Sequence, residues 1–155
     1  MGYEYKNNII TSYFSKPHQK INSILEEFNI KYKNEKKVMQ FSIDIFLEEE
    51  NKGIEIMGTY WHGDSRKYES ENLEERQKRC IEKDKRKLIT INKEGIEILY
   101  LWQIDIESDI ELCKKMINEF IKGTIKNCHS SSYFLEGGFL KEKDIKQYME
   151  INNTP

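Results

Sequence analysis

Residues 40–64, which read QFSIDIFLEEENKGIEIMGTYWHGD, contain two short apolar runs on either side of an acidic turn, Glu48–Asn51. Apolar and polar residues alternate in both runs, which is typical of β-strands and predicts a hairpin with Glu48–Asn51 as its loop. The register that places apolar residues on one face aligns two pairs of isoleucines: Ile45 with Ile54, and Ile43 with Ile56. This hairpin is the starting point for the predicted fold.

The same register places Asp44 directly opposite Glu55 on the other face of the hairpin. Directly opposed residues have Cβ atoms about 4.5–5.5 Å apart, and like charges at that distance are destabilising. Such a pair is expected where a cation lies between the carboxylates, or where one of them holds a proton. Past the second strand, the chain continues with Tyr60, Trp61 and His62. Paired carboxylates followed by aromatic residues and a histidine indicate a candidate active site.

Length and composition bound the class of protein. With 155 residues, 37% of them hydrophobic and 34% charged, the chain is expected to form a single domain, 1–155, with a highly charged surface. The net charge of −2 does not by itself favour binding to nucleic acid. An argument for a nucleic-acid partner therefore depends on local basic patches. The three cysteines fit no paired spacing, and the sequence shows no membrane span or signal peptide. We therefore expect a cytoplasmic protein.

Capping signals and hydrophobic periodicity predict an α/β fold in which helices flank a central mixed sheet of about four strands. The chain then divides into a core of about residues 15–106 and a C-terminal helical extension, 107–155. Outside the hairpin, the expected elements are a helix Pro17–Phe28 capped by Ser15, a strand Ile30–Val38, a loop Asp64–Asn72, a helix from Asn72 to Lys93, a buried central strand Ile96–Trp102, a helix from Ser108 to Gly123, a loop Ser130–Gly138 and a last helix Lys141–Ile151.

The helix that ends at Lys93 carries two further signals. Asp84 falls on the same face as Ile81 and Leu88, and an aspartate turned toward a core needs a partner or a metal ion. The stretch Arg76–Lys87 carries seven Lys or Arg residues against two acidic ones, so one face of the helix is locally basic.

These motifs, taken in order, resemble a known family. They are Asp44, the run IEIMGTYWH at 54–62, the run EKDKRK at 82–87, and the strand GIEIL followed by Trp102 and Gln103. The combination resembles the very-short-patch mismatch repair endonuclease, and more closely the small phage-type homing endonucleases that share its core, within the PD-(D/E)XK nuclease superfamily. The resemblance covers about Ser15 to Ile106 and implies a restriction-endonuclease-like core.

The resemblance implies roles for individual residues. Asp44 matches the metal-binding aspartate, and Glu55 stands where the superfamily has its second acidic residue. His62 matches the histidine that positions or activates water, and Asp84 matches the aspartate that supports that histidine. Tyr60 and Trp61 stand where the mismatch enzyme inserts aromatic side chains into DNA. Two positions depart from the family: Met57, where relatives carry an acidic residue, a lysine or a histidine, and Gln103, which replaces a frequent glutamate.

The chemistry of the residues agrees with this expectation. Asp44 and Glu55 supply the oxygen ligands that Mg²⁺ prefers, and His62 can accept a proton near neutral pH. Lys85 and Lys87 are expected to contact phosphates, and Trp61 to act as a wedge in the duplex. The predicted function is a Mg²⁺-dependent endonuclease acting on double-stranded DNA, with no membrane partner and with a homodimer left open.

Simpler interpretations stay open beside this one. Singly, an Asp–Glu pair on a hairpin is often structural, a lone histidine is often hydrogen-bonded within the fold, a tryptophan is usually core, and a basic helix face is usually solvated. His18 either caps its own helix or lies near the site, and the cap is the favoured interpretation. The first alternative function is a DNA-binding module of the same fold that has lost catalysis, as Met57 and Gln103 would allow. The second is a protein-interaction domain that uses the acidic helix Ser108–Gly123.

Overall fold

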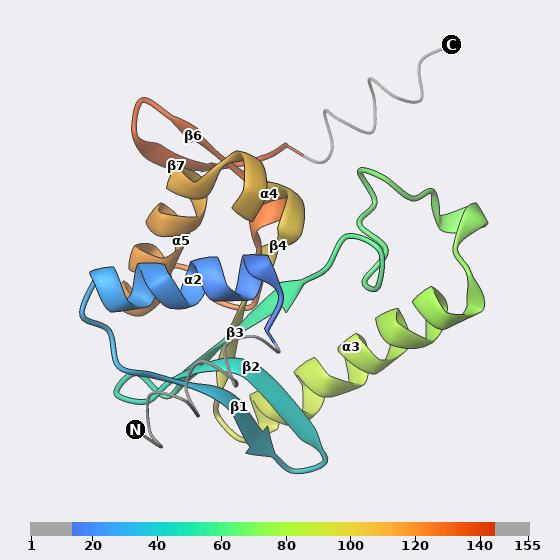
Figure 1. The fold of residues 1–155 in the computed structure, drawn as a ribbon, viewed down its shortest axis with the longest axis horizontal. Helices are drawn as coiled ribbons and strands as arrows, with labels where there is room; N and C mark the ends of the chain where they lie inside the picture. The colour runs from blue at the N-terminus through green and yellow to red at the C-terminus, as the bar shows by residue number, and fades with distance from the viewer. Residues whose placement is uncertain (1–13, 145–155) are drawn as a thin grey trace, which may run out of the picture.

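The computed structural model describes residues 14–144, which form three layers (Figure 1). A five-stranded sheet lies in the middle, with α2, α4 and α5 on one face and α3 on the other. The helices are α2 (Lys16–Glu27), α3 (Glu75–Lys93), α4 (Gln103–Ser108) and α5 (Ile110–Lys122), with 3-10 turns η1 (Ser70–Asn72) and η2 (Ser130–Ser132). The strands are β1 (Tyr32–Val38), β2 (Phe41–Leu47), β3 (Lys52–Met57), β4 (Glu97–Trp102), β5 (Cys128–His129), β6 (Tyr133–Glu136) and β7 (Phe139–Glu142).

The central sheet has the order β1-β2-β3-β4-β5 and mixes both kinds of pairing. The first three strands are antiparallel, whereas β4 runs parallel to β3 and β5 runs parallel to β4. The predicted α/β class with a mixed sheet between helices is therefore confirmed, with five strands where about four were expected. The strand predicted at Ile96–Trp102 is also confirmed as a central, buried one.

The hairpin β2–β3 has the predicted loop, Glu48–Asn51, and pairs Ile45 with Ile54 as expected. The ladder ends at that pair, because the Asp44 carboxylate accepts a hydrogen bond from the Ile56 amide (2.8 Å) in place of a backbone partner. Beyond it the strands diverge. Ile43 joins the cluster that faces α3, whereas Ile56 packs against the cluster on the other face. The predicted match of Ile43 with Ile56 was therefore wrong.

Two hydrophobic clusters hold the layers together. The first packs α2 and α5 against one face of β2, β3 and β4, and includes Ile21, Leu25, Ile45, Leu99 and Phe120. The second packs α3 against the other face through Ile91 and Leu88, which meet Ile43, Ile98 and Tyr100. Burying apolar side chains on both faces of the sheet is the main stabilising contribution to such a fold. Among residues 14–144, no helix combines the length and the apolar character needed to cross a membrane.

The first two helices begin where a side chain satisfies free backbone amides. Ser15 accepts a hydrogen bond from the His18 amide at the start of α2, as predicted. The cap of helix α3 lies two residues later than predicted, because Glu74 and Gln77 form the capping box there in place of Asn72 and Glu75.

Helix α5 also starts differently from the prediction. Ser108 does not cap it, because Ser108 is the last residue of the short helix α4 that follows β4 directly. Asp109 caps α5 by accepting a hydrogen bond from the Leu112 amide (3.3 Å). The predicted end is confirmed, since Gly123 adopts φ +85°, a left-handed conformation that glycine tolerates at a helix terminus.

The described residues after α5, which end at 144, contain short strands where a loop and the start of a helix were predicted. The segment expected as a loop, Ser130–Gly138, contains η2 and β6, and β6 pairs with β7 in an antiparallel hairpin beside α5. Tyr133, Leu135 and Leu140 pack against the first cluster, which anchors the hairpin. Lys141 and Glu142 belong to β7, so the helix predicted from Lys141 was wrong at its start; its remainder, 145–151, lies outside the described residues.

Candidate active site

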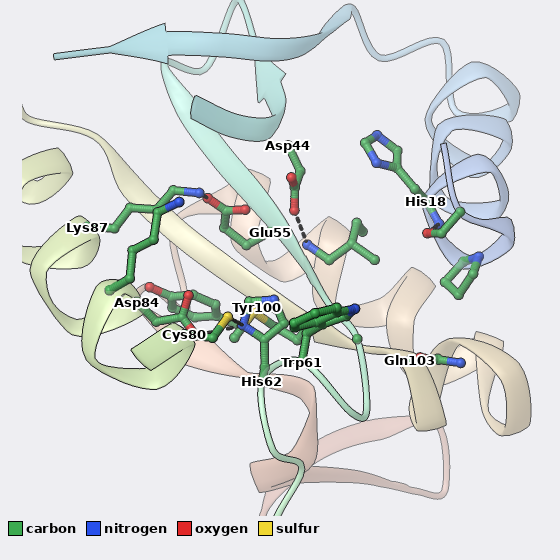
Figure 2. Close-up of a pocket in the computed structure, with 16 residues that line it drawn as sticks. His18, Asp44, Glu55, Trp61, His62, Cys80, Asp84, Lys87, Tyr100 and Gln103 are labelled. Atoms are coloured by element: carbon green, nitrogen blue, oxygen red, sulfur yellow. Dashed lines mark hydrogen bonds and ion pairs between the residues drawn. The ribbon is translucent and has the colours of Figure 1, made fainter. Parts of the chain in front are cut away.

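A cavity of about 530 Å³ lies between the start of α2, the end of β3 and helix α3 (Figure 2). Every residue that the sequence proposed as catalytic lines it: Asp44, Glu55, His62 and Asp84. They come from β2, β3, the turn after β3 and α3, so the fold brings together residues that span 41 positions of the chain from 44 to 84. Trp61 and Lys87 line the same cavity, whereas Lys85 lines a smaller neighbouring one and Tyr60 lies outside both linings.

The two carboxylates differ in their surroundings. Asp44 is held by the Ile56 amide, which donates to its Oδ2. Glu55 is only 6% exposed and forms an ion pair with Lys87 (Figure 2). Burial raises the pKa of Glu55 well above its ordinary value and the neighbouring Asp44 raises it further, while the Lys87 ammonium opposes both. The sequence predicted a cation or a proton at this pair, and the chain itself supplies a cation.

Lys87 therefore differs from its prediction as a residue that contacts phosphate from the helix face. Its side chain is 17% exposed and turns inward to Glu55, because position 87 lies on the side of α3 that faces the sheet. Lys85 keeps an outward orientation, with its side chain 67% exposed and 3.3 Å from Glu82. The two lysines are two positions apart on a helix, so they point to different sides.

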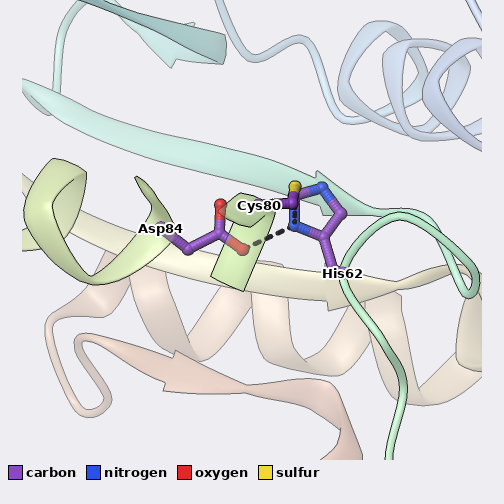
Figure 3. Close-up of side chains that lie close together, drawn as sticks. All are labelled: His62, Cys80 and Asp84. Carbon is purple, nitrogen blue, oxygen red and sulfur yellow. Dashed lines mark hydrogen bonds and ion pairs between the residues drawn. The ribbon is translucent and has the colours of Figure 1, made fainter. Parts of the chain in front are cut away.

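His62 is oriented by Asp84 (Figure 3). The Asp84 Oδ2 lies 2.6 Å from the His62 Nδ1, and both side chains are about one-fifth exposed, at 23% and 20%. A carboxylate at Nδ1 holds the proton on that nitrogen and leaves the lone pair of the neutral ring on Nε2. Asp84, which its helical spacing predicted to face inward, thus has His62 as its partner.

Cys80 is a residue that sequence reasoning assigned to the core alone. It lies one turn before Asp84 on α3, with its Sγ 3.7 Å from the His62 Nδ1. Burial raises the pKa of the Cys80 thiol, and the Asp84 charge raises it further. The thiol is therefore protonated at neutral pH. The sequence signal for placing Cys80 beside Asp84 was their spacing of four residues, because both positions share one helix face.

The rim of the cavity carries aromatic and cationic groups. Trp61 is 54% exposed and is not a core residue. The Arg76 guanidinium lies 5.2 Å from the centre of the Tyr60 ring and 5.7 Å from that of Trp61, within range of a cation–π contact. The Tyr60 hydroxyl donates to Glu74 (2.6 Å), which also accepts from Arg76. An exposed tryptophan beside an arginine suits contact with stacked bases or phosphates.

His18 approaches the cavity from α2. The residue is 6% exposed, and its Nε2 donates to the Asn34 Oδ1 (2.9 Å). The helix cap at this point uses the backbone amide of His18 and the Ser15 hydroxyl, so the histidine ring does not cap the helix as the sequence suggested. The alternative interpretation, that His18 lies near the site, agrees with its place in the lining of the cavity.

The turn after His62 is fixed by a network that the sequence did not reveal. Asp64 and Asp105 are 1% and 6% exposed, and both accept hydrogen bonds from Arg66. Asp105 also accepts from the Ser130 hydroxyl (2.6 Å), which lies in η2. Buried carboxylates with paired donors are stable, so this network ties the loop carrying His62 to α4.

The two positions that depart from the family pattern have structural contacts. Met57 is 4% exposed and packs in the cluster that faces α3, while it also lines the cavity. The Gln103 Oε1 accepts a hydrogen bond from the Thr59 amide (3.0 Å) at the end of β3. Neither side chain adds a carboxylate to the cavity, so the candidate Mg²⁺ ligands stay the predicted pair, Asp44 and Glu55. Their oxygen atoms fit Mg²⁺, which binds proteins through one or two carboxylates and keeps several waters.

The chain is similar to a solved structure, the catalytic domain of the homing endonuclease I-Bth0305I. The two share 25% identity with a TM-score of 0.54, and the match covers 72% of this chain and 99% of that chain. No protein-family model matches the chain, and neither does any curated protein. The mixed sheet with its flanking helices is therefore the fold of a homing endonuclease catalytic domain.

Proposed function

We propose that this chain is a Mg²⁺-dependent endonuclease that hydrolyses phosphodiester bonds in duplex DNA, of the homing or very-short-patch type. The observation that carries the proposal is the convergence of Asp44, Glu55 and the His62–Asp84 pair on one cavity. The likeness in fold to a homing endonuclease catalytic domain supports a DNA nuclease. Fold alone does not determine function, so the proposal depends on the site.

The residues have distinct parts in the proposed reaction. Asp44 and Glu55 would hold the metal ion, which when bound polarises the phosphate and stabilises developing charge. His62, with its Nε2 lone pair free of the Asp84 bond, accepts a proton from the attacking water. Asp84 keeps the ring in that tautomer and stabilises the imidazolium that forms. Lys87 neutralises negative charge beside the carboxylates.

Exposed groups beside the cavity suit a duplex partner. Arg76, Arg79, Lys83 and Arg86 are exposed and recur at helical spacing on one face of α3, and Lys83 also lines the cavity. Such a basic stripe binds the phosphate backbone without regard to sequence. Trp61 stands beside it at the cavity mouth, where an aromatic side chain can insert between or stack on bases.

Supercoiled plasmid incubated with the purified full chain and Mg²⁺ tests this function. We expect conversion to nicked or linear DNA, and a loss of roughly 100-fold or more in Asp44→Ala and in His62→Ala. EDTA should abolish the reaction. Cleavage that survives in both variants would assign the activity to another site or to a contaminant.

A second function is favoured by one observation. Met57 presents a thioether to the cavity, and a thioether is a poor ligand for Mg²⁺. A cavity lined by methionine at this position fits a DNA-binding module that has lost catalysis. In that case the chain binds DNA with a steep salt dependence and leaves plasmid and mismatched duplexes intact, with or without Mg²⁺.

A further inference from the structure

His62, Cys80 and Asp84 form a compact group of three different metal-ligating side chains (Figure 3). Their ligand atoms all lie within 4.8 Å of one another. The Nδ1 of His62 is 2.6 Å from the Asp84 Oδ2 and 3.7 Å from the Cys80 Sγ. Each of the three residues is partly exposed, so an ion from solvent can reach the group.

Two of these separations, sulfur to nitrogen and nitrogen to oxygen, can be compared with those of a tetrahedral zinc site. Zinc binds sulfur at about 2.3 Å and nitrogen or carboxylate oxygen at about 2.0–2.2 Å, which places neighbouring ligand atoms roughly 3.4–3.6 Å apart. The sulfur–nitrogen distance already matches, and the nitrogen–oxygen distance would widen by less than about 1 Å. Two of the ligands lie four residues apart on one face of α3, so the helix holds them side by side.

The ligand set differs in kind from the neighbouring carboxylates. Thiolate and imidazole favour Zn²⁺ and other borderline or soft ions, whereas Mg²⁺ takes oxygen ligands. Asp44 and Glu55 offer oxygen alone, while the group on α3 offers sulfur, nitrogen and oxygen. Two adjacent sites of different chemistry can therefore discriminate between two ions in one cavity.

We propose that His62, Cys80 and Asp84 bind a divalent ion of the zinc class, and that this ion inhibits the proposed nuclease. The binding of the ion is inferred from the geometry of the three side chains. The inhibition by that ion rests on the function proposed above. The three residues leave one position of a tetrahedral ion to water.

The inhibition follows from the chemistry of the ring. An ion bound through the Nδ1 lone pair requires the single proton of the neutral ring to move from Nδ1 to Nε2, and the Cys80 thiol releases its proton to solvent when it becomes a ligand. Nε2 is the nitrogen that must be free to accept a proton from water, and once protonated it no longer can. The same ion takes Asp84 away from its hydrogen bond to His62. The hydrolytic pair is therefore lost without any change in Asp44 or Glu55.

Cobalt titration of the full chain measures binding without reference to activity. Co²⁺ replaces Zn²⁺ in such sites and gives a near-ultraviolet charge-transfer band when it is bound by a thiolate. We expect this band at one equivalent of Co²⁺, its loss when Zn²⁺ is added, and a roughly 100-fold weaker affinity in Cys80→Ser. Cys128→Ser is the matched control, because Cys128 lies on β5 outside the group, and it should keep the band. A wild type without the band, or a band that persists in Cys80→Ser, overturns the proposal.

Inhibition of cleavage is measured by adding Zn²⁺ to plasmid reactions that contain excess Mg²⁺. Each protein is compared with its own rate in Mg²⁺ alone. We expect the wild type and Cys128→Ser to lose about tenfold or more of their rate at stoichiometric Zn²⁺, and Cys80→Ser to need roughly 100-fold more ion. Equal sensitivity in all three refutes inhibition through this group. If no protein cleaves DNA, the proposed nuclease fails, and the cobalt titration alone decides whether the site exists.

Discussion

At the scale of single residues, the Glu55–Lys87 pair has the largest consequence for the site. Burial and Asp44 both raise the pKa of Glu55, and Lys87 opposes them. Replacing Lys87 with methionine keeps the apolar stem but removes the charge that opposes the rise in the pKa of Glu55, so Glu55 becomes a weaker anionic ligand. We expect Lys87→Met to lower the cleavage rate about 100-fold, measured as kcat on plasmid DNA.

Lys93→Met provides the matched control for that change. Lys93 lies at the C-terminal end of the same helix and is exposed, away from the cavity. It should cleave at close to the wild-type rate. A Lys87→Met protein that is folded by circular dichroism and cleaves as fast as the control would show that the ion pair is structural only.

The His62–Asp84 hydrogen bond predicts a second effect at this scale. Asp84→Asn preserves the size of the side chain but removes the negative charge that stabilises the imidazolium form of His62. We expect a loss of about 100-fold or more in kcat with little change in KM, since DNA contacts are unaffected. Single-turnover cleavage at saturating DNA is the measurement. A variant that loses only affinity for DNA would contradict the role assigned to Asp84.

Periodicity in the sequence located the residues whose direction follows from local structure. Strand alternation identified Asp44 and Glu55, and the helical stripe identified Asp84. The partner of Lys87 could not be predicted in the same way, because it depends on how α3 crosses the sheet. Sequence spacing shows which face of a helix or strand a residue occupies. Tertiary packing decides which other residues that face contacts.

At the scale of elements, Gly53 controls how β2 packs on β3 and β4. A Cβ at this position would lie 2.8 Å from the Ile43 Cγ2 and 2.8 Å from the Ile98 Cδ1, closer than packed carbon atoms tolerate. We expect Gly53→Ala to destabilise the protein by about 1–3 kcal/mol in urea unfolding.

Gly58→Ala is the control for that substitution. A Cβ on Gly58 has its nearest neighbour, the Gln103 Oε1, at 3.9 Å, an ordinary contact distance. Its stability should stay within about 0.5 kcal/mol of the wild type, apart from the small effect of removing a glycine. Equal losses in the two variants would mean that backbone freedom rather than crowding is responsible.

The junction of β4 and β5 predicts a dependence of stability on pH. His129 stacks on Tyr100, with ring centres 4.3 Å apart, and accepts a hydrogen bond from the Trp102 indole at its Nδ1. Burial lowers the pKa of His129 below its ordinary value of 6.5. The unfolded state therefore binds a proton more readily than the folded state, so stability falls as the pH drops below 6.5 toward the lowered pKa.

Thermal unfolding followed between neutral and mildly acidic pH measures this effect. We expect Tm to fall with pH in the wild type and to fall less steeply in His129→Gln, which has no titratable ring at this position. The variant is less stable at neutral pH because it loses the stacking contact with Tyr100. Identical slopes in the two proteins would assign the acid sensitivity to other groups.

The same scale shows where sequence reasoning about elements succeeds and fails. The hairpin loop, the Ser15 cap and the Gly123 stop were correct because each depends on residues within one turn. The β6–β7 hairpin was missed because its strands are short and gain their stability from packing on α5. The predicted pairing of Ile43 with Ile56 was wrong because the Asp44 carboxylate, in place of a backbone carbonyl, accepts the hydrogen bond from the Ile56 amide.

At the scale of the whole molecule, charge is unevenly distributed although the net charge is −2. Helix α3 presents its basic stripe beside the cavity, on the opposite side of the sheet from α5. On α5 the charges are mixed, since Lys114, Lys115 and Lys122 lie within 4 Å of glutamates. DNA should therefore bind at α3, and its affinity should depend on the local stripe rather than on the total charge.

The salt dependence of DNA binding tests this distribution. The logarithm of the binding constant falls with the logarithm of salt concentration by about 0.9 per phosphate contact, so removing three contacts should reduce the slope by roughly 2–3. We expect this reduction, with weaker binding, in a triple alanine variant of Arg79, Lys83 and Arg86, measured by fluorescence anisotropy on a short duplex. The triple alanine variant of Lys114, Lys115 and Lys122 removes the same formal charge and should keep the wild-type slope. Equal reductions in both would assign binding to net charge, and no binding by the wild type would favour the protein-interaction domain that uses α5.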